Sequence, residues 1–392
     1  MIIIFIVSIL AFYLAFNLGA NDVANSMGTS VGSKAISLKQ ALIIAGILEF
    51  LGALLFGKNV TENLATNITN LQIFAPNPHI LILGMIAVLI SGGIWMQIAT
   101  NFGLPVSSSH AIVGAIAGFS LIHSGVNAVN WSNIFNISIA WIITPLISGL
   151  ISSLFYALIR FYILNKNTPI YYLQEWIPWL SAILISIFTV IVFPQSVEKP
   201  ILTLGIGAIA TFSLTCFSLI QLPEKDLEKS FAKFQVLTAC FVAFAHGSND
   251  VGNAIAPLAL INYIHLTGKV PNNHLNIPIW IMIIGGLGIV LGLAIWGKKV
   301  ITTIGESIIK LQPSSGFCAE LATGTTILLA SRLGLPVSTS HALVGAVVGI
   351  GLIQNWQSVK LDTLKSIVLA WVITIPISGI LAALIFSFCR LF

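Results

Sequence analysis

The chain has 392 residues, of which 57% are hydrophobic and only 7% are charged, with a formal net charge of +5. Soluble domains carry about 25% charged residues, so this composition excludes a water-soluble domain, and the small positive charge calls for no nucleic-acid partner. Runs of about 18 or more apolar residues can cross roughly 30 Å of hydrocarbon as helices and are too long for the alternating strands of a barrel. The sequence predicts an all-α polytopic membrane protein.

Twelve apolar segments follow one another, and we expect about 12 transmembrane helices. The first segment lacks a basic leader and a small-residue cleavage site, so we expect it to be retained as a helix. If the N-terminus lies outside, most Lys and Arg residues fall in inside loops, which predicts a bacterial cytoplasmic membrane protein with both termini outside. The segments span about 2–18, 40–57, 80–99, 104–122, 135–162, 175–193, 201–221, 235–262, 277–297, 317–331, 335–353 and 364–389.

Four sequence blocks occur twice in the same order, which indicates two homologous halves. The first and eighth segments carry the first block and are seven crossings apart, so the halves run in opposite directions. Inverted-topology repeats with broken or re-entrant helices at the midplane are typical of secondary transporters. We therefore predict a first repeat (1–162), two linking helices with a cytoplasmic loop (163–234) and a second repeat (235–392). The block pairs are GANDVAN (19–25) and GSNDVGN (247–253), LGALLFGKNV (51–60) and LGLAIWGKKV (291–300), GLPVSSSHAIVGAIAG (103–118) and GLPVSTSHALVGAVVG (334–349), and AWIITPLISG (140–149) and AWVITIPISG (370–379).

The first repeated block places an Asp and an Asn three residues apart. Asp22 and Asn25 share a helix face, as do Asp250 and Asn253. An ionised Asp within hydrocarbon costs a few kcal/mol and is retained mainly where it meets a cation or water. Carboxylate and amide oxygens are hard ligands that suit Na⁺ or a proton carrier. We expect these residues to bind the coupling ion where a nearby glycine, Gly19 in the first half, lets the helix unwind; helix capping is the alternative.

The third repeated block places three hydroxyl residues after Gly-Leu-Pro-Val. Proline favours a helix start, so the hydroxyls fall at a helix N-terminus, whose free N–H groups and positive dipole attract anions. Two such ends from inverted halves would hold a small tetrahedral oxyanion, and no Lys or Arg would hinder its release. N-capping by Ser or Thr is the alternative. The predicted anion ligands are Asn21, Ser107, Ser108, Ser109, Asn249, Ser338, Thr339 and Ser340.

Further polar residues lie in or beside apolar runs. Glu49 and Glu320 each occur in one half only and are candidates for a role in transport, with a position at the membrane edge as the alternative. Gln97, Thr100 and Ser331 lie just before the hydroxyl motifs and are expected to support them.

Two other residue types invite a chemical interpretation that we do not favour. His110 and His341 follow the hydroxyl triplets, but adjacent helix residues point about 100° apart and no acid orients the imidazole, so a catalytic Ser–His pair is not expected. The cysteines lack metal-ligand spacing and are expected to be small buried hydrophobic residues. They are Cys216, Cys240, Cys318 and Cys389.

These motifs resemble those of the inorganic phosphate transporter (PiT) family. The resemblance rests on GANDVANSMGTSVGS (19–33), HGSNDVGNAIAP (246–257), the two Gly-Leu-Pro-Val motifs and SGFCAELA (315–322), and it covers almost the whole chain. It implies phosphate as substrate, Na⁺ or H⁺ as co-transported ion, no other cofactor and often a homodimer. It also implies that Asp22 and Asp250 are essential, that the hydroxyl triplets contact phosphate, and that Glu49 and Glu320 matter for transport.

The sequence therefore predicts a transporter, not an enzyme, that imports phosphate by symport with Na⁺ or H⁺. A carboxylate–amide site serves either ion. A sulfate permease of the same fold is one alternative, because it would use the same donors. An uncoupled anion channel is another, although two repeat-related Asp residues argue against it.

Overall fold

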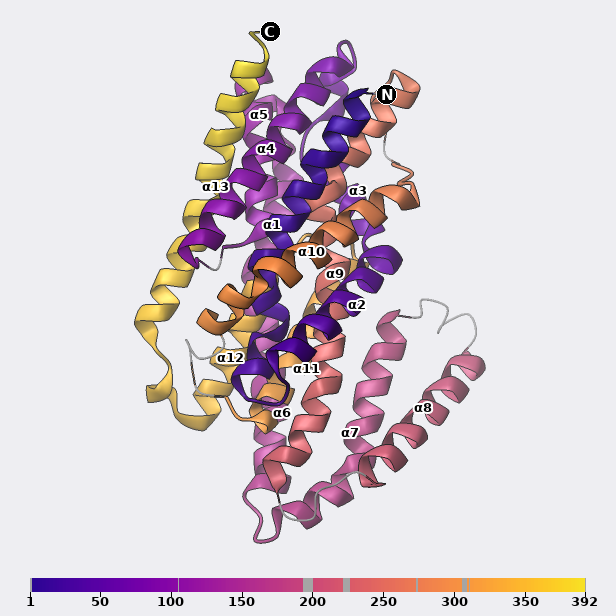
Figure 1. The fold of residues 1–392 in the computed structure, drawn as a ribbon, viewed down its shortest axis with the longest axis vertical. Coiled ribbons are helices and arrows are strands. Elements are labelled where there is room, and N and C mark those ends of the chain that lie inside the picture. Colours follow the sequence, from indigo (N-terminus) through magenta and orange to yellow (C-terminus); the bar gives the residue numbers. More distant parts are fainter. Residues whose placement is uncertain are drawn as a thin grey trace.

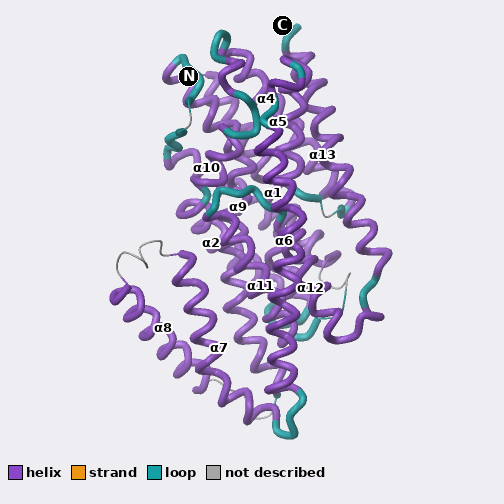
Figure 2. The backbone as a smooth tube through the Cα atoms, turned by 180° about the vertical axis from the view of Figure 1, so that it is seen from behind, coloured by secondary structure: helices purple, strands orange, loops and turns teal. Residues whose placement is uncertain are grey.

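The protein is a bundle of long helices, described by a computed structural model (Figures 1 and 2). The structure describes residues 2–104, 106–192, 200–220, 226–272, 274–304, 309 and 311–391, with only the backbone of 200–205, 217–220, 299–304 and 358. Within these residues the α-helices are α1 (Ile2–Gly32), α2 (Leu38–Phe56), α3 (Lys58–Thr66), α4 (Pro78–Phe102), α5 (Ser108–Ser124), α6 (Trp131–Ile159), α7 (Pro169–Val192), α8 (Pro200–Ile220), α9 (Leu227–Thr267), α10 (Ile279–Ile304), α11 (Pro313–Arg332), α12 (Thr339–Asn355) and α13 (Leu361–Cys389).

A helix covers most of each predicted apolar segment, and α3 is an additional short helix. The segments predicted to start at 104 and 335 begin in loops, and the predicted ends at 193 and 221 lie outside the described residues. Among the described residues, seven helices are long and apolar enough to cross a membrane. Five predicted segments are not among these seven. Helices α5 and α12 have only 17 residues each, and the described apolar part of α8 is Ile206–Cys216. Helices α9 and α11 carry many polar residues. Both termini lie at the same end of the bundle (Figure 1).

The predicted unwinding at the first repeated block is wrong. Both α1 and α9 continue as unbroken helices through their Asn-Asp motifs. A β-carbon on Gly19 would lie 2.1 Å from the carbonyl oxygen of Ile289 in α10, and one on Gly247 would lie 2.0 Å from that of Glu49 in α2. The glycines are therefore needed for close approach of two helix backbones.

The chain is interrupted instead between α4 and α5 and between α11 and α12. Gly103 and Gly334 adopt left-handed backbone angles, with φ of 65° and 69°, which end or follow the first helix of each pair. Ser107 and Ser338 then cap the second helix, each accepting a hydrogen bond from the backbone N–H three residues later at 3.3 Å. Each pair forms a helical hairpin.

The two hairpins occupy opposite ends of the bundle and meet at its centre. In Figure 1 the α4–α5 hairpin lies in the upper half and the α11–α12 hairpin in the lower half. Their tips are in contact, since the Ser109 hydroxyl donates to the Val337 carbonyl oxygen at 2.8 Å. Two apolar cores accompany them, one that includes α4 and α5 and one that includes α11 and α12.

Contacts between the two halves come in exchanged pairs. Helix α1 packs on α10 while α9 packs on α2, and α5 packs on α13 while α12 packs on α6. At the hairpin tips, His110 Nδ1 lies 3.2 Å from the Trp371 carbonyl oxygen, and His341 Nδ1 lies 3.0 Å from that of Trp141. Such exchange is expected of two halves related by an approximate twofold axis. Helices α7 and α8 stand to the side of this arrangement (Figure 2).

Candidate functional site

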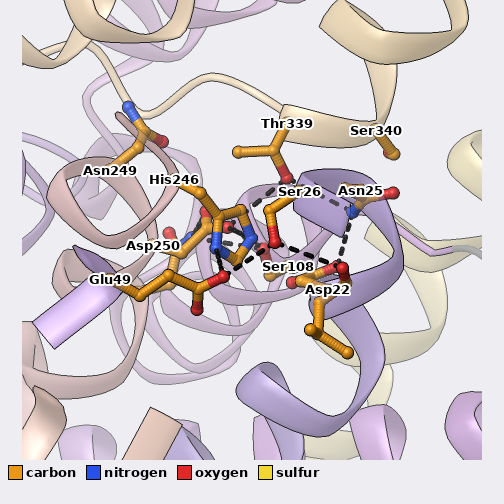
Figure 3. A network of polar contacts seen from close by, with 12 residues as sticks. Asp22, Asn25, Ser26, Glu49, Ser108, His246, Asn249, Asp250, Thr339 and Ser340 are labelled. Carbon is orange, nitrogen blue, oxygen red and sulfur yellow. Dashed lines mark hydrogen bonds and ion pairs between the residues drawn. The ribbon is translucent and has the colours of Figure 1, made fainter. Parts of the chain in front are cut away.

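The candidate site lies where the middles of α1 and α9 meet the first residues of α5 and α12 (Figure 3). The structure brings together most of the residues predicted to bind the ion and the anion, although their sequence positions are up to about 300 apart. All of these residues are buried, with exposed fractions of at most 5%. They are Asn21, Asp22, Asn25, Ser107, Ser108, Ser109, Asn249, Asp250, Asn253, Ser338, Thr339 and Ser340.

Each predicted Asp–Asn pair is formed on its helix. Asn25 donates its amide to Asp22 Oδ1 at 3.0 Å, and Asn253 donates to Asp250 Oδ1 at 3.1 Å. This is the geometry expected of residues three apart on one helix face. The amide of Asn25 also reaches Thr339 Oγ1 at 3.3 Å, so the first-half pair contacts the second-half hairpin.

The second pair makes the corresponding contact with the first-half hairpin. Asn253 donates to Ser108 Oγ at 3.3 Å and to Ser109 Oγ at 3.2 Å. Ser108 and Thr339 are the first helical residues of α5 and α12, and their hydroxyls lie 3.5 Å and 3.4 Å from the Asp250 carboxylate. The carboxylates and the two helix N-termini therefore share one buried space.

The six predicted hydroxyls do not have the same surroundings. Ser107 and Ser338 accept the capping hydrogen bonds of α5 and α12, as the capping alternative predicted for them. Ser109 donates to a carbonyl oxygen of the opposite tip, and Ser340 Oγ lies 3.0 Å from Ser338 Oγ. Of the six, Ser108 and Thr339 are the two whose hydroxyls contact the Asp250 carboxylate.

Asn21 and Asn249 hold the hairpin tips. Asn21 donates to Thr100 Oγ1 at 3.1 Å and to the Leu104 carbonyl oxygen at 3.3 Å. Asn249 makes the equivalent bonds to Ser331 Oγ at 3.0 Å and to a carbonyl oxygen of the second tip at 3.2 Å. Figure 3 shows the Asn249 amide apart from the carboxylates. Thr100 and Ser331 thus lie directly behind the site.

His246 is part of the site, although the sequence analysis assigned it no role. Its Nε2 lies 2.7 Å from Asp250 Oδ2 and its Nδ1 lies 3.2 Å from Glu49 Oε1, and both carboxylates and the imidazole are buried (Figure 3). An imidazole can donate to two carboxylates only when both nitrogens carry hydrogen, so this arrangement suits the cationic form. The equivalent first-half residue is Leu18, so a search for residues kept in both halves passes over His246.

Glu320 and Gln97 lie outside this cluster. The Glu320 carboxylate accepts hydrogen bonds from four side chains, three on Oε1 and one on Oε2. Its donors are Thr29 at 2.6 Å, Ser30 at 2.5 Å, Gln235 at 3.0 Å and Thr238 at 2.9 Å. Gln97 accepts a hydrogen bond from the Tyr13 hydroxyl.

Some buried oxygens of the cluster accept no hydrogen bond from the described residues. They include Asp22 Oδ2, Glu49 Oε2 and Asn253 Oδ1. Buried polar atoms normally have partners, and carboxylate and amide oxygens without a donor suit a hard cation. Ligand atoms of Asp22, His246 and Asp250 lie within 4.8 Å of one another, close enough for one ion to reach both carboxylates.

The known proteins that this chain resembles are named as phosphate transporters or phosphate permeases. The sequence profile of the Phosphate transporter family matches residues 18–382. The chain is 39% identical to a Pyrococcus horikoshii protein and 38% identical to a Chlamydia pneumoniae protein, both named "Putative phosphate permease"; the alignments cover 90% and 91% of this chain and 89% and 91% of those proteins. A solved structure titled "The sodium-dependent phosphate transporter" matches with a TM-score of 0.94 and 38% identity over 100% of both chains.

Proposed function

The chain belongs to the phosphate transporter family, and on that premise we propose that it imports inorganic phosphate across a bacterial cytoplasmic membrane by symport with Na⁺. As a member, it is a multi-pass membrane transporter and not an enzyme. One observation carries the coupling proposal: Asp22 and Asp250 are buried against the N-terminal hydroxyls of α5 and α12, where an anion would bind.

The N-termini of α5 and α12 supply the phosphate site. Each offers free backbone N–H groups and the positive end of a helix dipole. Ser108 and Thr339 add a hydroxyl at the first helical position of each. Because the two ends come from opposite halves, phosphate would be held between both hairpins.

The carboxylates make phosphate binding depend on a cation. A phosphate charge about 4 Å from a carboxylate is repelled by about 4 kcal/mol at an effective dielectric of about 20, which weakens binding by about a thousandfold. Na⁺ on the unpartnered oxygens of Asp22 and Asn253 would remove this repulsion. Linkage then requires phosphate to strengthen Na⁺ binding by the same factor.

His246 makes the two carboxylates unequal. Its imidazole already lies between Asp250 and Glu49, whereas Asp22 accepts the Asn25 amide on Oδ1 and no hydrogen bond on Oδ2 from the described residues. Asp22 is therefore the main Na⁺ ligand, and Asp250 is partly neutralised by the protein itself.

Transport follows if the hairpins move in turn. They enter the bundle from opposite ends and both touch the site, so displacing one opens the site to one side. The distribution of Lys and Arg among the loops favours an outside position for both termini. The family resemblance favours a homodimer.

Uptake of radiolabelled phosphate into proteoliposomes tests this function. Purified protein is given an inward Na⁺ gradient at equal pH, or an inward proton gradient without Na⁺. Na⁺-driven, saturable uptake that sulfate does not compete with is expected. Uptake driven by protons alone would reassign the carboxylates as proton carriers. Uptake that neither gradient drives above equilibrium would indicate a channel, and uptake of sulfate in place of phosphate would indicate a sulfate permease.

A further inference from the structure

A cavity lies beside α5, between α6 and α13, away from the candidate site. Its volume is about 600 Å³, within the range of roughly 300–1,000 Å³ typical of ligand pockets. The lining is almost entirely apolar, with Val113, Ala117, Ile134, Ile380 and Ala383 among its side chains. The Ser138 hydroxyl, which also lines it, already donates to a backbone carbonyl oxygen in its own helix. Such a cavity does not favour water.

The surroundings of the cavity favour a hydrocarbon chain. The outer faces of α6 and α13 expose large apolar side chains, such as Leu146 at 67% and Leu384 at 63%. Ile380 and Ile122 at the cavity are themselves 60% and 56% exposed, so the mouth opens toward the same environment. In a membrane protein this environment is the acyl chains of the bilayer.

A cation lies beyond one end of the cavity. Arg390 follows the end of α13, about 10 Å along the helix from Ala383, which lines the cavity. Its guanidinium lies 5.9 Å from the Phe386 ring and 3.4 Å from His123 Nδ1 at the end of α5. Among the described residues, Arg390 forms no ion pair with a carboxylate within 4.0 Å. An anionic group at this point would therefore neutralise the Arg390 guanidinium.

The indole of Trp131 lies at the same cavity. It lines the cavity, is 49% exposed and donates its N–H to the Val126 carbonyl oxygen. Tryptophan is enriched where a membrane meets water. The apolar cavity, the interfacial indole and the cation thus follow the order of acyl chain, glycerol and phosphate in a phospholipid. We propose that the groove between α5, α6 and α13 is a specific site for an anionic membrane phospholipid, whose chain fills the cavity and whose phosphodiester binds Arg390.

The site has a direct contact with the transport machinery. Trp141 lines the cavity, and its indole N–H donates to the Pro336 carbonyl oxygen in the second hairpin tip at 2.9 Å. Its ring also lies 3.9 Å from the ring of His110 in the first hairpin. A lipid chain against Trp141 and α5 therefore packs on residues that position both hairpins.

Native mass spectrometry of the full-length protein with added phosphatidylglycerol tests this site. Arg390→Gln removes the cation at an exposed position and is expected to lower the retained lipid about fivefold, while Arg390→Lys retains most of it. Ala383→Phe fills the cavity and is expected to lose most of the lipid. Leu384→Phe, on the neighbouring lipid-facing position, is the matched control and is expected to bind as the unaltered protein does.

Equal retention by the unaltered protein, Arg390→Gln and Ala383→Phe would overturn the proposal. Displacement of the lipid by inorganic phosphate would also overturn it, because Arg390 would then be a site for free anions. This experiment requires no transport, so its failure is distinct from failure of the proposed symport.

Discussion

His246 Nε2 lies 2.7 Å from Asp250 Oδ2 in the buried centre of the protein. The same ring reaches Glu49 through Nδ1, so one imidazole joins two carboxylates on two helices. The repeat-equivalent position of His246 in the first half is Leu18, and that of Glu49 in the second half is Ile289. The site thus combines repeated Asp–Asn pairs with an imidazole–carboxylate contact that has no counterpart at the repeat-equivalent positions.

His246→Gln is expected to lower the stability of the folded protein more than Glu49→Gln does. His246→Gln leaves Glu49 and Asp250 buried without a cation, and breaking a buried ion pair in this way costs about 3–5 kcal/mol of the free energy of unfolding. Thermal unfolding in detergent measures this loss. The double variant His246→Gln/Glu49→Gln is expected to recover part of it, because one unpaired charge is removed. Additive losses in the double variant would show that the two side chains do not interact.

Replacement of Asp22 is expected to abolish coupling without unfolding the protein. Asp22→Asn keeps the shape of the side chain but removes the charge on the unpartnered oxygen. Na⁺-driven phosphate uptake should fall by more than about tenfold, which corresponds to about 1.4 kcal/mol of lost interaction. Asp226→Asn, at the exposed start of α9, is the control and should transport normally. Normal Na⁺ dependence in Asp22→Asn would remove Asp22 from the ion site.

The Ser108 and Thr339 hydroxyls, which contact Asp250 at the starts of α5 and α12, are expected to bind phosphate. Ser108→Ala and Thr339→Val should each raise the phosphate concentration for half-maximal uptake about three- to tenfold, the value of one lost hydrogen bond. Ser153→Ala changes a hydroxyl whose hydrogen bond, among the described residues, goes to a carbonyl oxygen within α6, and it should have no effect. An equal change in all three variants would indicate a general loss of packing.

Close packing at Gly19 and Gly247 predicts that Gly→Ala lowers the stability of the protein, opposite to its usual effect in a helix. Glycine to alanine inside a helix normally stabilises a protein by about 0.5–1 kcal/mol. Gly19→Ala and Gly247→Ala should instead lower the melting temperature, because the new methyl group would meet a backbone carbonyl oxygen of the neighbouring helix. Gly207→Ala in α8 places the added carbon more than 4 Å from any atom of the described residues, and it should be neutral or stabilising. A gain in stability at position 19 or 247 would contradict the described packing.

Repetition in the sequence predicts the Asp–Asn pairs and the hydroxyl motifs that the structure brings together, but it does not predict His246. The Asp–Asn pairs and hydroxyl motifs could be found because each occurs twice and is polar within an apolar chain. His246 could not be found in this way, since its partners come from α2 and from its own helix and its repeat equivalent is Leu18.

The remaining differences from prediction concern helix packing. A glycine beside the first Asn-Asp motif predicts unwinding, but the helix is continuous there, and the glycine is explained by its close approach to α10. Apolar runs alone also do not distinguish two arms of a hairpin from two membrane crossings. The α4–α5 and α11–α12 hairpins become visible only in the structure, where the short helices α5 and α12 begin at the bundle centre.

In the proposed mechanism, phosphate and Na⁺ bind at one place and strengthen each other's binding. Equilibrium binding of radiolabelled phosphate to the purified protein, measured over a series of Na⁺ concentrations with choline as the replacement cation, tests it most directly. Phosphate affinity should rise steeply with Na⁺, Na⁺ affinity should rise by the same factor with phosphate, and both effects should vanish in Asp22→Asn. A phosphate affinity that does not change between choline and Na⁺ would contradict the account.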